Sequence, residues 1–142
     1  MRTNLVRGIA LLAGFGAGDP ASAQQHGAAA PNIARPNMVL QQVVEGLPTD
    51  DEQTVRVMTA TFKPGDKTVY HSHRFPVTVY VLEGAFTLEL EGRPPLTVKA
   101  GEAMVEPPKV PMTGYNRSAT ETKVVIFYVS TNDTPFLDMM AH

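Results

Sequence analysis

The sequence predicts an all-β domain, an antiparallel sandwich or small barrel of about eight short strands. Strand-like segments recur at spacings of roughly 10 residues with glycine and proline turns between them. The 142 residues include 12 prolines and 11 glycines, many for a helical protein. Amphipathic helix spacing is absent from the sequence, except over a short stretch of the tail at 137–140. Together these observations favour strands and turns throughout the folded part of the chain.

Composition excludes several classes of protein. Hydrophobic residues make up 43% and charged residues 18%, which is typical of a chain that folds around one core. The formal net charge of -2 gives no electrostatic case for nucleic acid or for an anionic membrane. Because cysteine is absent, disulfides, thiolate chemistry and cysteine-type zinc sites are excluded.

Residues 1–23 have the features of a secretory signal peptide. Arg2 and Arg7 give a positive start, and an apolar run follows at 8–18. The small residues that end the segment fit signal peptidase and place the cut before Gln24. The apolar run is too short to cross a bilayer. We therefore expect a periplasmic or secreted protein without a membrane anchor.

The remaining chain divides into a leader and one domain. Residues 24–36 hold alanines, prolines and a glycine but few bulky apolar groups, so we expect a flexible leader. Residues 37–142 form the predicted domain. The expected strands cover 38–44, 55–62, 77–82, 86–91, 96–98, 103–105 and 124–129. The last of them is apolar throughout, which indicates burial on both faces.

Two histidines near the middle of the chain are the clearest chemical signal. His71 and His73 stand two residues apart, so in a strand their imidazoles point to the same face. Neutral imidazoles aimed at one point suit a transition metal such as copper, zinc, nickel or iron. The alternative is a pair of surface histidines at a turn.

Seven residues between positions 54 and 130 fall in register with two motifs of a known family: Gly65, His71, His73, Gly84, Gly101, Pro107 and Asn116. This spacing resembles the cupin superfamily, whose members are small barrels. The resemblance implies a single jelly-roll (cupin) β-barrel of short antiparallel strands, with His71 and His73 inside it. It also implies that Asn116 has a structural role.

The resemblance is incomplete at two positions where the family carries metal ligands. The glutamate position is occupied by Val77 and the second histidine position by Met112. Met112 either fills the volume of the lost histidine or joins His71 and His73 as a soft third ligand. Two imidazoles and a thioether suit Cu(I).

Other side chains are weaker candidates. Glu106 is either a replacement carboxylate or a solvated group at the barrel rim, and strand alternation favours the rim. Arg74 either holds a carboxylate-bearing ligand in a bidentate fork or is solvated. Tyr115 either lines the cavity with Arg74 as a substrate-binding residue or packs between subunits.

Three functions stay open at this point. The first is an exported cupin that binds a small molecule or a metal ion in its barrel. The second is a metal-dependent enzyme, an oxygenase, isomerase or lyase. The third is a periplasmic Cu(I)-binding protein that uses His71, His73 and Met112. We also expect a homodimer, because small cupins commonly pair through outer sheet faces and terminal strands, and 38–44 is apolar.

Overall fold

The computed structural model describes residues 32–141. The expected signal peptide, 1–23, and most of the expected leader, 24–36, lie outside the described residues. The chain divides into two units, and the second, Pro36–His142, holds the strands. The described residues form no helix, and so none that could span a membrane.

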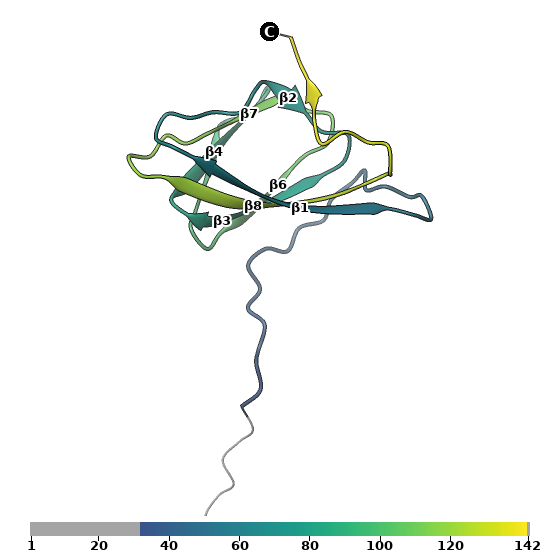
Figure 1. Ribbon diagram of the computed structural model, residues 1–142, viewed down its shortest axis with the longest axis horizontal. Helices are drawn as coiled ribbons and strands as arrows, with labels where there is room; N and C mark the ends of the chain where they lie inside the picture. The colour runs from purple at the N-terminus through teal and green to yellow at the C-terminus, as the bar shows by residue number, and fades with distance from the viewer. Residues whose placement is uncertain (1–31, 142) are drawn as a thin grey trace, which may run out of the picture. The chain divides into compact units, whose positions relative to one another are not determined.

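Residues 32–141 form nine strands in two antiparallel sheets (Figure 1). The strands are β1 (Thr54–Phe62), β2 (His71–Ser72), β3 (Val77–Glu83), β4 (Ala85–Leu90), β5 (Leu96–Lys99), β6 (Ala103–Glu106), β7 (Met112–Tyr115), β8 (Thr122–Ser130) and β9 (Asp138–Met139). One sheet has the order β1-β8-β3-β6, and the other has the order β5-β4-β7-β2-β9. The prediction of an all-β fold of short antiparallel strands is confirmed.

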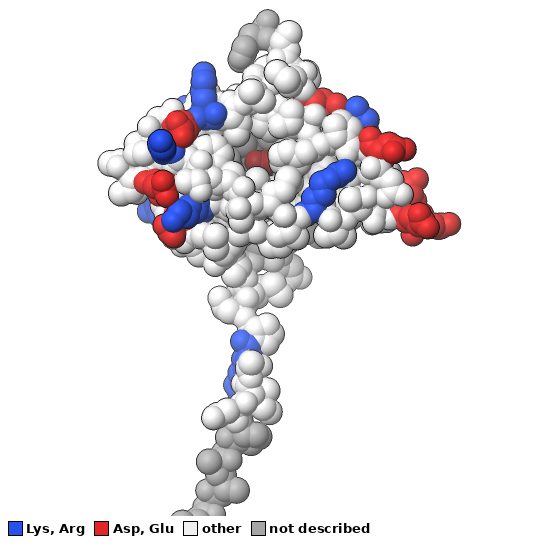
Figure 2. Space-filling model, viewed as in Figure 1, with Lys and Arg blue, Asp and Glu red and all other residues white. Residues whose placement is uncertain are grey.

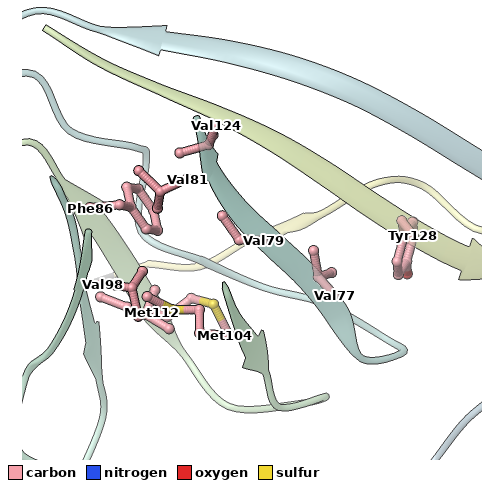
Figure 3. Close-up of a cluster of buried hydrophobic side chains, with 10 residues drawn as sticks. Val77, Val79, Val81, Phe86, Val98, Met104, Met112, Val124 and Tyr128 are labelled. Atoms are coloured by element: carbon pink, nitrogen blue, oxygen red, sulfur yellow. The ribbon is translucent and has the colours of Figure 1, made fainter. Parts of the chain in front are cut away.

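The core lies between the two sheets and follows from alternation along the strands. In β3, Val77, Val79 and Val81 are buried, whereas the side chains between them are half-buried. Figure 3 shows these valines with side chains of the opposite sheet, among them Phe86 and Met112. This packing fixes the position of β3 and of its neighbour β6, the strand that ends at Glu106.

Three expectations about strands are corrected. Residues 38–44 form no strand, since apolar residues alone do not supply a pairing partner; Val43 is 96% exposed. The tail stretch at 137–140 is not helical but contains β9, which pairs with β2. Strand β7 was not expected, because its short mixed sequence shows no clear alternation. It is fixed by pairing with β4.

The outer face of the β1-β8-β3-β6 sheet carries exposed apolar side chains. Val55 and Val57 of β1 are 68% and 61% exposed, and Phe127 of β8 is 44% exposed. The expected burial of 124–129 on both faces is therefore wrong, because one face of β8 lies on the outside of the sheet. Val57 and Phe127 are direct cross-strand partners, so they form one continuous apolar surface.

Gly84 joins β3 to β4 at a place that has no room for a side chain. Its φ of +75° lies in the left-handed region. A Cβ there would approach the Glu121 carbonyl oxygen to 2.5 Å and the Thr122 Oγ1 to 2.6 Å. The Thr122 hydroxyl donates to the carbonyl of Ala85 and accepts from its N–H, so it is fixed.

We predict that Gly84→Ala destabilises the protein far more than Gly92→Ala. Gly92 has a similar φ, +71°, but an added Cβ there would meet open space. Gly92→Ala therefore measures only the cost of a left-handed backbone at a residue with a side chain, about 1 kcal/mol. Gly84→Ala adds backbone clashes, and we expect a further loss of about 2 kcal/mol or more in the free energy of unfolding. Urea denaturation measures both. Equal losses would contradict the close approach at Gly84.

Candidate functional site

The two histidines lie inside the barrel, His71 in the second sheet and His73 directly after its strand. Strand β2 consists of His71 and Ser72, and it is paired with β7 on one side and β9 on the other. His71 is 4% exposed and His73 is 1% exposed. Their Nε2 atoms lie 3.1 Å apart, so the structure brings the two imidazoles together.

A backbone carbonyl fixes the orientation of each imidazole. The Nδ1 of His71 is 2.7 Å from the carbonyl oxygen of Val69, and the Nδ1 of His73 is 2.7 Å from that of Phe136. A carbonyl oxygen only accepts, so each Nδ1 carries a proton and donates it. In the neutral imidazole, each Nε2 then presents a lone pair to the site. These are the atoms that face one another.

Glu106 completes the group, contrary to the expectation of a solvated rim residue. It is 5% exposed, and its Oε2 lies 3.1 Å from the Nε2 of His73. In β6 both Met104 and Glu106 are buried, so alternation turns Glu106 inward. Its direct cross-strand partner in β3 is Val77, the position at which the family motif carries its glutamate. A carboxylate is therefore present on the neighbouring strand.

The electrostatics of the three groups require a cation or a proton. Two Nε2 lone pairs and an ionised carboxylate repel one another when nothing positive lies between them. One proton on the Nε2 of His73 satisfies both of its contacts, to His71 and to Glu106. A metal ion held by all three atoms would also remove this repulsion. As they are placed here, no three or more His, Asp or Glu side chains among the described residues form a group that could hold a metal ion.

Burial lowers the pKa of His71 below its usual value. The hydrogen bond to the Val69 carbonyl raises this pKa, and the neighbouring His73 lowers it again. Desolvation is the largest of these effects, because the charged imidazolium is poorly solvated inside the barrel. The neutral form, which is the one able to bind a metal, is thereby favoured.

A cavity of about 60 Å³ adjoins these atoms. It is lined by His71, His73 and Glu106 and otherwise almost wholly by apolar side chains, among them Phe86 and Phe136. Figure 2 shows a hollow in the centre of this face with an acidic side chain inside it, while other charged groups lie around the periphery. A larger cavity of 660 Å³ borders residues 40–45 and contains no histidine in its lining.

The other candidates from the sequence do not line the small cavity. Met112 is fully buried in the apolar core, on the strand opposite His71. Arg74 is half-exposed and forms a bidentate ion pair with Asp138, both N···O distances being 2.9 Å. The ring of Tyr115 is stacked against Arg117 on the outside of the second sheet, 4.4 Å from ring centroid to guanidinium carbon. Asn116 is buried and holds loop backbone.

Comparison with known sequences identifies one family. A family model described as a cupin domain matches residues 58–128, a span that includes His71, His73 and Glu106. Comparison with curated proteins gives no match.

Solved structures confirm the jelly-roll fold. A cupin-like protein from Thermotoga maritima is 26% identical, with a TM-score of 0.52 over 61% of this chain and 65% of that one. A conserved protein with a double-stranded β-helix domain from Klebsiella pneumoniae is 16% identical, with a TM-score of 0.53 over 75% and 100%. An oxalate oxidase in complex with the substrate analogue glycolate is 20% identical, with a TM-score of 0.52 over 61% and 46%. The chain thus spans less than two thirds of the first and third of these proteins.

We predict that stability falls as the pH drops below about 6.5, the usual pKa of histidine. Because His71 has a lower pKa in the folded protein, the unfolded chain binds more protons between the two pKa values. The contribution of His71 to the free energy of unfolding is therefore complete above about pH 6.5. It is lost as the pH falls towards the folded-state pKa, by at most about 1.4 kcal/mol per pH unit. Urea unfolding of the wild type and His71→Asn between about pH 8 and pH 5 measures it. Identical pH dependences would contradict the prediction.

Proposed function

The chain belongs to the cupin domain family, and from this premise we propose that its barrel binds a transition-metal ion through His71, His73 and Glu106. The observation that carries the proposal is that the Nε2 of His73 lies 3.1 Å from both the Nε2 of His71 and the Oε2 of Glu106. Each imidazole is held in the binding tautomer by a carbonyl, as metal-ligating histidines usually are.

The separations themselves support this proposal. Zinc and similar ions hold nitrogen and oxygen ligands at about 2.0–2.2 Å, so neighbouring ligand atoms around one ion lie about 3.0–3.5 Å apart. The distances of His73 Nε2 to both its neighbours fall in this range. Small shifts of side chains, without movement of strands, would then admit an ion.

The chemistry of the donors favours a divalent ion. Two histidines and one carboxylate are the protein ligands of several catalytic zinc sites and of non-haem iron(II) sites. The carboxylate offsets part of the charge of a divalent ion in the low-dielectric barrel. The alternative Cu(I) site with Met112 has less support, because Met112 lies in the apolar core rather than in the cavity lining. A metal-dependent enzyme stays open, since a three-ligand set leaves positions for a small molecule.

We predict that Glu106→Gln weakens the binding of Zn(II) and Ni(II) roughly tenfold or more, a loss of at least about 1.4 kcal/mol. The amide keeps the size of the side chain but removes the charge that offsets the ion. Isothermal titration of protein without a histidine tag measures the affinity. The exposed Glu91, changed to Gln, is the matched control and should leave it unchanged.

Two outcomes contradict this proposal. Failure of the wild type to bind Zn(II), Ni(II), Fe(II) or Mn(II) overturns metal binding altogether. Equal affinities of wild type and Glu106→Gln exclude the carboxylate as a ligand. A double variant in which His71 and His73 are both Ala should show no binding above background, which separates this site from surface binding.

We also propose that the protein is exported and pairs as a homodimer. Export rests on the sequence of residues 1–23, and pairing is supported by the exposed apolar side chains of Val55, Val57 and Phe127. Intact mass of the exported protein should correspond to a chain that begins at Gln24.

Light scattering should give twice the monomer mass, and Val57→Lys should reduce this mass. An uncut chain or a monomer at high concentration would contradict these proposals.

A further inference from the structure

The C-terminal residues Thr134–Met140, here called the C-terminal arm, lie directly against the histidine-bearing strand. Within the arm, β9 pairs with β2, with His71 opposite Met139 and Ser72 opposite Asp138. The N–H of Met140 also donates to the carbonyl of Tyr70, at 3.0 Å. Figure 1 shows the arm, in yellow, beside β2. Strand β2 is thus held between β7 and residues from the far end of the chain.

Phe136 connects the arm to the site itself. Its carbonyl oxygen accepts the Nδ1 proton of His73, and its ring packs against the imidazole with centroids 5.0 Å apart. Its side chain and that of Leu137 line the small cavity. The arm therefore supplies both a wall of the cavity and the acceptor that orients one of the two imidazoles.

An exposed ion pair fastens the arm next to His73. Arg74 follows His73 in the chain, and Asp138 opens β9; their side chains form the two hydrogen bonds of a bidentate pair. Arg74 lowers the pKa of Asp138 below its usual value, in keeping with this contact. The pair links the segment that carries His73 to the arm that carries its hydrogen-bond acceptor.

We propose that the C-terminal arm is part of the metal site, with Arg74 and Asp138 as positioning residues that keep the Phe136 carbonyl on His73 and slow the exchange of the ion. This inference rests on the proposed metal binding. His73 has an alternative tautomer, in which Nε2 carries the proton and donates it to Glu106. That tautomer cannot bind a metal through Nε2. The Phe136 carbonyl disfavours this alternative tautomer, because the carbonyl can accept a hydrogen bond only from an imidazole that carries its proton on Nδ1.

The expected effects are modest, because both partners of the ion pair are about half-exposed. Asp138→Asn and Arg74→Gln should each speed dissociation of Ni(II) or Zn(II) about two- to fivefold, as judged by transfer to an excess of chelator. The charge-exchanged double variant, Arg74→Asp with Asp138→Arg, should recover much of the wild-type rate. High salt should speed dissociation from the wild type and change the single variants less.

The chain offers a matched control. Arg117 and Glu89 form another exposed ion pair, with side-chain exposures of 49% and 38% against 53% and 37% for Arg74 and Asp138. Glu89 lies in β4, which pairs with β5 and β7 but not with the arm, and it does not line the small cavity. Glu89→Gln should leave the dissociation rate at the wild-type value, although it removes a comparable ion pair.

A second measurement reports on the tautomer of His73 and does not require a metal. The ¹⁵N chemical shifts of the imidazole distinguish protonated from unprotonated ring nitrogens. In metal-free wild type at alkaline pH, where imidazoles are neutral, His73 should carry its proton on Nδ1. Asp138→Asn should shift part of the population to the Nε2 tautomer, and Glu89→Gln should not.

The outcomes separate this proposal from the proposed function. If the wild type binds metal but Asp138→Asn and Arg74→Gln match it in dissociation rate and tautomer, the role of the arm is overturned and metal binding stands. If the wild type binds no metal, the proposed function fails. An unchanged tautomer in Asp138→Asn then overturns the positioning role as well, whereas a shifted one preserves it.

Discussion

Two backbone carbonyl oxygens determine which nitrogen atoms of the two histidines face the interior of this barrel. The carbonyls of Val69 and Phe136 each take the Nδ1 proton of one histidine, so both Nε2 atoms face inward. Hydrogen bonds of this kind, at 2.7 Å and largely removed from water, are costly to break without a substitute. Because Val69 precedes His71 by two residues and Phe136 lies near the C-terminus, the histidines are fixed by the chain before them and by the end of the chain. Glu106 belongs to the same group because its Oε2 lies 3.1 Å from one of these Nε2 atoms, that of His73.

The carboxylate shows what motif spacing predicts and where it fails. The family motifs led correctly to the cupin fold. They also led to His71 and His73, whose imidazoles the structure brings together, but they place a glutamate at the position of Val77. The structure puts Glu106 directly across from Val77 on the adjacent strand, pointing to the same face. Alternation could have found it from Met104, which is buried two residues earlier. However, Ala103 and Val105 are apolar too, and alternation counted from them gave the wrong expectation of a rim position for Glu106.

Strand prediction succeeded where alternation was strong and failed where pairing alone makes the strand. β1, β3 and β4 repeat apolar and polar residues, and the structure gives them nearly the expected bounds. In β7, Gly114 is required because the ring of Phe86 lies 2.3 Å from where its Cβ would be. A glycine in a short segment without clear alternation favours a turn over a strand. β9 has two residues and exists only through β2, so no local pattern marks it.

The charge of the three buried groups determines how readily a proton or a metal ion occupies the site. Two neutral imidazoles and one carboxylate carry a net charge of about −1, which is unfavourable in a low-dielectric interior. One proton brings the group to neutrality, and a divalent ion leaves it with one positive charge instead of the two it would have without Glu106. Proton and metal therefore compete for the same lone pairs, and metal affinity must decline as the solution becomes more acidic. The depressed pKa of His71 moves that competition in favour of the metal, because it keeps one of the two imidazoles unprotonated.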